Sequence, residues 1–258
     1  MDQTQLLDLY HRASKHSNYQ VLSSAVASLL GGHAVAVRSR SENERLAYLL
    51  PRVPIHGLHV ADIGGNTGFF SFELLRHGAG RVDYFEGNQA HHDFVRSAAE
   101  RLGLGERLHT HHRYVTFEPD AFPTVDCTLL LNVLHHLGDD FGDERTDKAT
   151  ARARMLECLA AASRRSRLLV LQLGFNWKGD RHQPLFRSGT KAEMIDFVAS
   201  GTAADWTIAH IGIASRRTGE VVFEDLNTRN LARDDALGEF LNRPIFVMRS
   251  RHLDEGSR

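Results

Sequence analysis

Leu58-His-Val-Ala-Asp-Ile-Gly-Gly-Asn-Thr-Gly-Phe-Phe70 is the most informative segment of this 258-residue chain. A short apolar run, typical of a buried β-strand, leads directly into a glycine-rich turn that begins at Asp62. In open α/β sheets, ligands bind beyond the carboxyl ends of the strands, where such turns lie. The segment therefore predicts a loop that binds a nucleoside cofactor.

The turn lacks the two phosphate-binding signatures that glycine-rich loops carry. The dinucleotide fingerprint needs glycines at its first, third and sixth positions, where this chain has Gly64, Asn66 and Phe69. No Gly-Lys-Ser/Thr follows, which excludes a P-loop. The carboxylate of Asp62 would disfavour a phosphate and favour a cation. We therefore expect a ligand that has no phosphate and carries a positive charge.

The same turn resembles motif I of class I S-adenosylmethionine (SAM) dependent methyltransferases, Asp/Glu-x-Gly-x-Gly-x-Gly, with asparagine in place of the middle glycine. The resemblance covers residues 58–173. It implies a Rossmann-like fold and SAM as the cofactor. It also implies a binding loop made of Asp62, Gly64, Gly65, Asn66 and Gly68.

Periodicity predicts an α/β, doubly wound and mostly parallel sheet of seven strands. The expected strands are 58–63, 81–86, 107–115, 125–133, 167–173, 207–215 and 244–250. Helices are expected at 68–77, 89–102, 144–163 and 190–200. The last of these begins with a capping box from Thr190 to Glu193 and ends at Gly201.

The remaining segments predict additions to this sheet. Residues 1–55 are expected to form an N-terminal helical cap with a capping box at Ser41 to Glu44. Residues 56–258 would form the SAM-binding domain. Its 216–243 insertion, between the last two strands, is expected to carry a helix around 234–241. Residues 254–258 are expected to be a frayed tail.

Composition limits the classes of partner and location. The 31 basic and 32 acidic residues are interspersed, so no nucleic-acid-binding face is indicated. Cys127 and Cys158 have no disulfide or zinc spacing. Neither a signal peptide nor a transmembrane segment is recognisable. We expect a cytoplasmic protein, while peripheral membrane association and the oligomeric state stay open.

Acidic and polar residues follow the second strand, where a nucleoside would lie. Glu86 comes eighteen residues after Gly68, close to the spacing at which an acid binds ribose hydroxyls. Gly87 and Asn88 would flank the adenine, and Tyr114 is a candidate for contact with the purine. Asn132, at the end of the fourth strand, is a further cofactor candidate. The resemblance also implies a cap that holds the SAM carboxylate, a task that suits Arg45.

The fourth strand leads into Val133-Leu-His-His136, which resembles a signature of small-molecule methyltransferases. A histidine there could remove the proton of an acceptor hydroxyl. Adjacent residues point to different faces, so only one of His135 and His136 should reach the substrate. The candidate acceptor residues are Asn176, Trp177 and Asp180 in the loop after the fifth strand and Tyr19 in the cap. No metal site is expected.

These observations favour a SAM-dependent O-methyltransferase of a small molecule or glycan. A fainter resemblance, carried by the histidine pair, Trp177-Lys-Gly and Arg243-Pro-Ile-Phe-Val, extends to the methyltransferase part of bacterial O-antigen chain-terminating enzymes and implies a saccharide acceptor. Two alternatives stay open. One is N-methylation of a small amine, and the other is a SAM-binding protein without catalytic activity.

Overall fold

The computed structural model describes residues 3–12, 19–31, 37 and 39–253. Its strands are β1 (His59–Ile63), β2 (Arg81–Glu86), β3 (Leu108–His112), β4 (Val125–Leu131), β5 (Ser166–Gln172), β6 (Trp206–Arg217), β7 (Glu220–Asp225) and β8 (Ile245–Ser250). Its α-helices are α1 (Gln3–His11), α2 (Ser24–Leu29), α3 (Glu42–Leu49), α4 (Phe69–Arg76), α5 (Gln89–Arg101), α6 (Lys148–Ser163), α7 (Lys191–Thr202) and α8 (Gly238–Leu241). Short 3₁₀ turns are η1 (Leu134–His136), η2 (Trp177–Gly179) and η3 (Asp235–Leu237).

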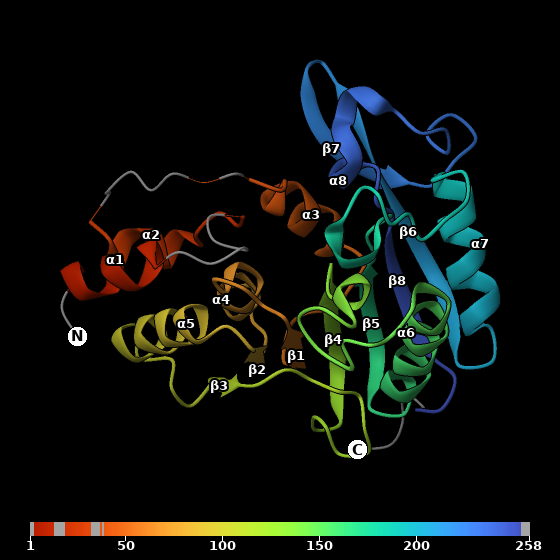
Figure 1. The fold of residues 1–258 in the computed structure, drawn as a ribbon. Helices are drawn as coiled ribbons and strands as arrows, with labels where there is room; N and C mark the ends of the chain where they lie inside the picture. The colour runs from red at the N-terminus through yellow and green to blue at the C-terminus, as the bar shows by residue number, and fades with distance from the viewer. Residues whose placement is uncertain (1–2, 13–18, 32–36, 38, 254–258) are drawn as a thin grey trace.

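The strands form one sheet in the order β3-β2-β1-β4-β5-β8-β6-β7 (Figure 1). β1 pairs in parallel with β2 on one side and β4 on the other, while β8 runs antiparallel to both of its neighbours. The strand order therefore reverses between β1 and β4, which is where ligands bind in open α/β sheets. The predicted doubly wound, mostly parallel sheet is confirmed.

The sheet has eight strands, so the prediction of seven was wrong by one. β7 lies in the segment that was expected to connect the last two strands. It pairs with β6 as an antiparallel hairpin, whose turn contains Thr218 and Gly219 at positive φ. The helix expected near 234–241 is present as η3 and α8.

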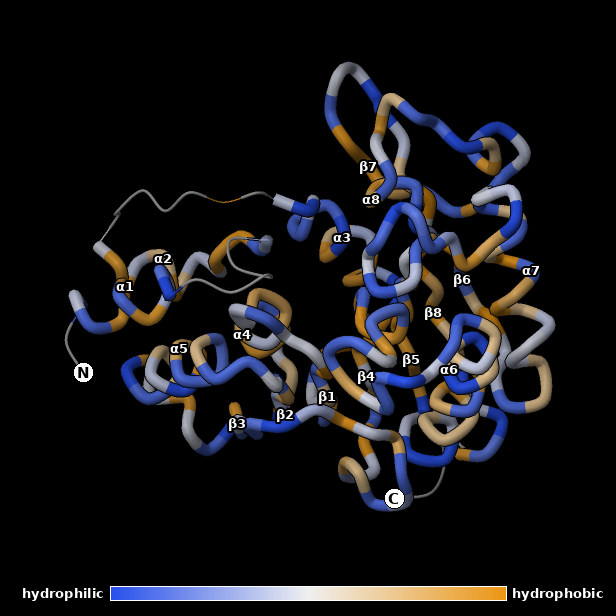
Figure 2. The backbone as a smooth tube through the Cα atoms, in the orientation of Figure 1, coloured by the Kyte–Doolittle hydropathy of each residue, from blue (hydrophilic) through white to orange (hydrophobic). Residues whose placement is uncertain are grey.

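Two layers of helices cover the sheet because its strands are apolar on both faces. Along β5, Leu168 and Val170 pack with α1 to α5, whereas Leu169 and Leu171 pack with α6 and α7. This alternation follows from the two-residue period of a strand. Figure 2 shows that the central strands are largely hydrophobic and that the loops beyond β7 are largely hydrophilic. The two hydrophobic cores lie on the two faces of the sheet, and the loops lie at the ends of its strands.

The structure confirms one predicted capping box and corrects the other. Thr190 accepts the Glu193 amide at 3.2 Å, and the Glu193 carboxylate reaches back to the Thr190 amide. Ser41 has a left-handed φ of 56° and makes no capping hydrogen bond. The carboxylate of Glu42 instead accepts the amide of Arg40 at 3.0 Å.

The sequence predicted that α7 ends at Gly201, and this prediction is wrong. The helix continues to Thr202, and a Cβ at Gly201 would lie 2.5 Å from the Leu156 side chain. This glycine therefore permits close packing of α7 on α6 rather than a turn. The expected frayed tail lies outside the described residues, and among the described helices none is both long and apolar enough to cross a membrane.

Candidate functional site

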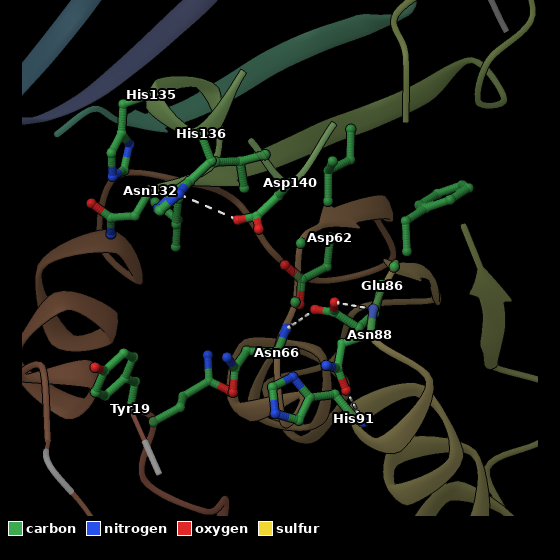
Figure 3. A pocket seen from close by; sticks show the side chains of 18 of the residues that line it. Tyr19, Asp62, Asn66, Glu86, Asn88, His91, Asn132, His135, His136 and Asp140 are labelled. Carbon is green, nitrogen blue, oxygen red and sulfur yellow. Dashed lines mark hydrogen bonds and ion pairs between the residues drawn. The ribbon is translucent and has the colours of Figure 1, made fainter. Parts of the chain in front are cut away.

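A cavity of about 540 Å³ opens at the carboxyl ends of β1, β2 and β4 (Figure 3). Its wall combines the glycine-rich loop, the residues after β2 and β4, and side chains from the α3 and α8 regions. The volume lies within the range of small-molecule sites. Most of the residues singled out from the sequence are thus brought together at the point where the strand order reverses.

The glycine-rich loop has a backbone that its sequence explains. Gly64, Asn66 and Gly68 all have positive φ, at 70°, 53° and 79°. A Cβ at Gly64 would lie 2.6 Å from Val133, and one at Gly65 would lie 2.6 Å from the Tyr84 ring. Asparagine tolerates the left-handed region better than most residues. Asn66 can therefore replace the middle glycine without changing the path of the loop.

Glu86 is fixed beside this loop by backbone amides. Its carboxylate accepts the Asn66 amide at 2.9 Å and the Asn88 amide at 2.8 Å (Figure 3). Asn88 in turn caps α5 through the His91 amide. Glu86 is thus a pre-positioned acceptor at the end of β2.

Tyr114 packs beside Gly87 at the rim of the cavity. A Cβ at Gly87 would lie 2.2 Å from the Tyr114 ring, so the glycine lets the ring lie close to the backbone. Tyr114 is 48% exposed although it is a large aromatic residue. Its ring is therefore available as a flat wall for a ligand.

Asp62 is buried at the base of the loop and accepts the Ser71 hydroxyl at 2.6 Å. Burial raises the pKa of this carboxyl to about 6, because the charged form loses hydration. Asp62 borders the cavity as predicted. The carboxyl therefore keeps its proton to a higher pH than an exposed aspartate does.

Arg45 borders the cavity but is already paired. Its guanidinium lies 3.2 Å from Glu42 and donates to Gln172 at 3.3 Å, and the side chain is buried. Burial lowers its pKa to about 10. Because Glu42 matches its charge, the structure does not favour the predicted role of Arg45 as a carboxylate clamp.

Arg40 is a cavity residue that the sequence analysis missed. Its guanidinium lies 4.7 Å from the Tyr19 ring and 4.5 Å from the Phe240 ring. Within the described part of the chain, no carboxylate forms a salt bridge with it, and burial, followed by the charge of Arg243, lowers its pKa. No motif surrounds Arg40, so only the folded arrangement reveals an unpaired cation there.

A buried polar network joins the ends of β4 and β5 to the segment before β8. Asn132 donates to Gln172 at 2.9 Å and accepts from Arg243 at 2.8 Å. Arg243 also forms a two-point ion pair with Glu239. Asn132, with a φ of 64°, was predicted at the site. Its partners were not, because they lie 40 and 111 residues away along the chain.

The two histidines after β4 have different environments. His135 is 1% exposed, and its Nδ1 accepts the Gly174 amide at 3.2 Å. His136 has a side chain that is 16% exposed, and its Nδ1 lies 3.3 Å from Asp140 (Figure 3). His135 is thus held by the backbone in the cavity wall. His136, whose Nδ1 lies within ion-pair distance of a carboxylate, is the better acid–base candidate.

The structure also brings His136, Asp139 and Asp140 together. One ligand atom from each lies within 4.8 Å of the others. Such an arrangement can share a proton or hold a divalent cation. No metal site was predicted from the sequence.

The loop after β5 contributes different residues from those expected. Trp177 is buried in the core, and its indole N–H donates to the Leu137 carbonyl at 2.7 Å. Neither Trp177 nor Asn176 nor Asp180 borders the cavity, whereas Lys178 and Gly179 do. The large apolar indole packs inward because burial stabilises it more than a place at the rim. Tyr19 does line the cavity, as predicted.

Comparison of the sequence with protein families and with curated proteins found no match. Among solved structures, a crystal structure of WbdD, described as a bifunctional kinase-methyltransferase, is similar with a TM-score of 0.61 and 15% identity. The match covers 95% of this chain and 46% of the WbdD chain, so this chain spans less than half of that protein.

A putative RNA methyltransferase from Pyrococcus horikoshii matches with a TM-score of 0.45 and 14% identity, covering 96% of this chain and 98% of the other. A putative tRNA methyltransferase from Streptococcus pneumoniae matches with a TM-score of 0.48 and 14% identity, covering 83% of this chain and 72% of the other. These two likenesses are too distant to support an argument about the substrate. Together with the sheet order, the similarity to WbdD establishes a class I SAM methyltransferase-like fold.

Proposed function

We propose that this chain is a SAM-dependent methyltransferase that methylates a hydroxyl group of a small molecule or glycan. The observation that carries the proposal is Glu86, held by two backbone amides beside the glycine-rich loop and facing a cavity of about 540 Å³. A carboxylate at the end of β2 is suited to accept the ribose hydroxyls of a nucleoside. The fold and the loop chemistry support the same assignment.

The cofactor would lie along the cavity from Tyr114 to Arg40. Gly87, Asn88 and Tyr114 would surround the adenine, and the 64–68 loop would approach the sugar closely. The methionine carboxylate would bind the guanidinium of Arg40, whose positive charge lacks a salt-bridge partner in the described chain. Arginine suits a carboxylate because its N–H groups can donate two parallel hydrogen bonds.

Acid–base chemistry at the other end of the cavity would fall to His136. When bound, SAM supplies an electrophilic methyl group. The imidazole would share its Nδ1 proton with Asp140 and take the hydroxyl proton of the acceptor at Nε2. Positioning by a carboxylate 3.3 Å away supports this role. The other features of the site align the acceptor and exclude water.

The acceptor class rests on the sequence more than on the cavity. The resemblance to O-antigen chain-terminating enzymes supports a saccharide hydroxyl, and an interspersed charge pattern argues against nucleic acid. A small-molecule hydroxyl fits the same cavity. The proposal includes a cytoplasmic location. It also includes contact with a membrane surface if the acceptor is a lipid-linked glycan.

Calorimetric titration with SAM and with S-adenosylhomocysteine tests the first half of the proposal. We expect one binding site for each, and loss of both when Glu86 is replaced by alanine. Glu73→Ala is the matched control, because Glu73 is a buried acid outside the cavity. Methyl transfer from labelled SAM to a panel of hydroxylated acceptors tests the second half. Failure to bind SAM would remove the proposal.

N-methylation is the second candidate, and one observation favours it. Asp139 and Asp140 place two carboxylates beside His136 at the acceptor end, which would attract a protonated amine. The ammonium would first lose its proton to one of these carboxylates or to solvent, and the neutral amine then needs less help from a base than a hydroxyl does. Retention of most of the activity after His136→Gln would favour an amine acceptor, while tight SAM binding without turnover on any acceptor would indicate a non-catalytic protein.

A further inference from the structure

A second cavity lies on the opposite part of the sheet from the cofactor loop. It has a volume of about 530 Å³, is open to solvent, and is lined by the β6–β7 hairpin, residues of the segment 227–237 and the first residue of α7. It shares no lining residue with the cavity at the ends of β1, β2 and β4. Any ligand it binds would therefore occupy a site separate from the methyl-transfer chemistry.

The most unusual residue of this cavity is Lys191. Its side chain is 1% exposed, yet it is a cation at the first position of α7. Nζ donates to the Asn230 carbonyl at 2.9 Å, and within the described ranges no carboxylate forms a salt bridge with it. A buried ammonium is costly unless an anion or several acceptors compensate the lost hydration. Asp234, which also lines the cavity, attracts this charge but forms no salt bridge with it among the described residues.

Two arginines add to this charge. Arg216 donates to the Gly219 carbonyl at 3.4 Å, and Arg229 lies in the segment after β7. Neither forms a salt bridge with any described residue. Arg217, by contrast, is neutralised by an ion pair with Glu224. The other acid of the cavity, Asp234, caps the turn η3 through the Ala236 amide. The cavity therefore has an excess of positive charge.

We propose that the cavity beside the β6–β7 hairpin binds an oxyanion of the phosphate class, either free or as a monoester of a small molecule. Arginine guanidinium groups match the geometry of phosphate oxygens, and a lysine supplies a compact charge. The cavity volume is in the range of small-molecule sites. Lys191, Arg216 and Arg229 would each contact the anion. The proposal does not depend on methyl transfer, since it uses none of the residues of the first cavity.

Calorimetric titration of the full chain with inorganic phosphate, glucose 6-phosphate and AMP tests this proposal. We expect saturable binding at one site and a loss of affinity of about tenfold or more in the R216A/R229A double variant. Tighter binding of either ester than of phosphate would identify a monoester as the ligand. Equal affinity would identify the free anion.

The R154A variant is the matched control, because Arg154 is an exposed arginine of α6 paired with Glu157 and far from this pocket in the sequence. It should bind phosphate as the unmodified chain does. Lys191→Met removes the buried charge, and circular dichroism checks whether it folds. If Lys191→Met does not fold, the R216A/R229A variant still tests the proposal, because Arg216 and Arg229 are exposed. Absence of saturable binding, or equal affinity in the double variant, would overturn the proposal.

Discussion

Single residues explain both the success and the errors of the sequence analysis at the site. Asn66 keeps the loop intact because it accepts a φ of 53°. The two histidines were expected to point to different faces, yet both border the cavity and their ring centroids lie 4.3 Å apart. Only the structure shows that His135 is held by the Gly174 amide. Arg40 and Arg45 are close in sequence and have no distinguishing pattern. They differ because the Glu42 carboxylate forms an ion pair with Arg45 and not with Arg40.

Replacing His136 by glutamine tests its role as the base. We expect kcat to fall by roughly 10²–10⁴-fold while the dissociation constant of SAM stays unchanged, because the imidazole acts on the acceptor rather than on the cofactor. Steady-state kinetics and calorimetry measure the two quantities. His135→Gln is the comparison, and it should lower thermal stability more than His136→Gln does. An unchanged kcat in the His136→Gln variant would show that His136 is not the general base.

Replacing Arg40 by alanine tests the proposed carboxylate clamp. We expect SAM affinity to fall by roughly tenfold to a hundredfold, since a charge-assisted hydrogen bond is lost. Methylthioadenosine, which lacks the amino-acid part of SAM, should bind both proteins equally. Titration of the two ligands separates a clamp from general damage to the cavity. Equal losses for both ligands would contradict the assignment.

The raised pKa of Asp62 predicts how stability depends on pH. Its folded-state pKa of about 6 lies above the ordinary value of 3.8 for an aspartate, so the folded protein binds an extra proton between those two pH values. The contribution of Asp62 to the free energy of unfolding is therefore largest below about pH 4. It is lost as the pH rises through about 6, and the loss is about 3 kcal/mol at most.

Asp62→Asn should remove this dependence. Relative to the unmodified chain, its free energy of unfolding should increase as the pH is raised from about 4 to about 8. Urea denaturation across that range measures the difference. Parallel curves for the two proteins would show that burial of Asp62 has no such effect.

Whole elements were predicted best where local signals agree with the fold. Strand β2 has the predicted bounds, because a β-rich run ends at a glycine. The strand β7 was missed, since Glu220-Val-Val-Phe-Glu-Asp225 is short and follows a segment interpreted as a connection. The apparent capping box at Ser41 failed because contacts with Glu42 hold the backbone in a left-handed conformation. These contacts lie within three residues of Glu42, so the Ser-x-x-Glu spacing alone does not distinguish them from a cap.

The two capping boxes provide a matched test of this point. Thr190→Ala should lower the free energy of unfolding by about 1 kcal/mol, because the Glu193 amide loses its acceptor. Ser41→Ala should change it by less than about 0.5 kcal/mol, since Ser41 makes no cap. Chemical denaturation of both variants gives the comparison. A larger effect at Ser41 than at Thr190 would contradict the structure.

At the scale of the whole molecule, the part of the cavity around the glycine-rich loop was predictable, and the part at the ends of β4 and β5 was not. Asp62, the glycine-rich loop and Glu86 follow consecutive strands, so their meeting at one edge follows from the topology. The network of Gln172, Asn132 and Arg243 brings together distant segments without a motif. Trp177 was expected at the rim, yet the core of the folded chain holds its indole. The arrangement of this part of the cavity therefore depends on packing that the sequence does not encode locally.

A crystal structure of the chain with S-adenosylhomocysteine is the most direct test of the cofactor assignment. We predict ligand density in the cavity at the ends of β1, β2 and β4, with the ribose hydroxyls at Glu86 and the carboxylate at Arg40. An empty cavity under saturating ligand, or ligand bound elsewhere on the molecule, would contradict the account.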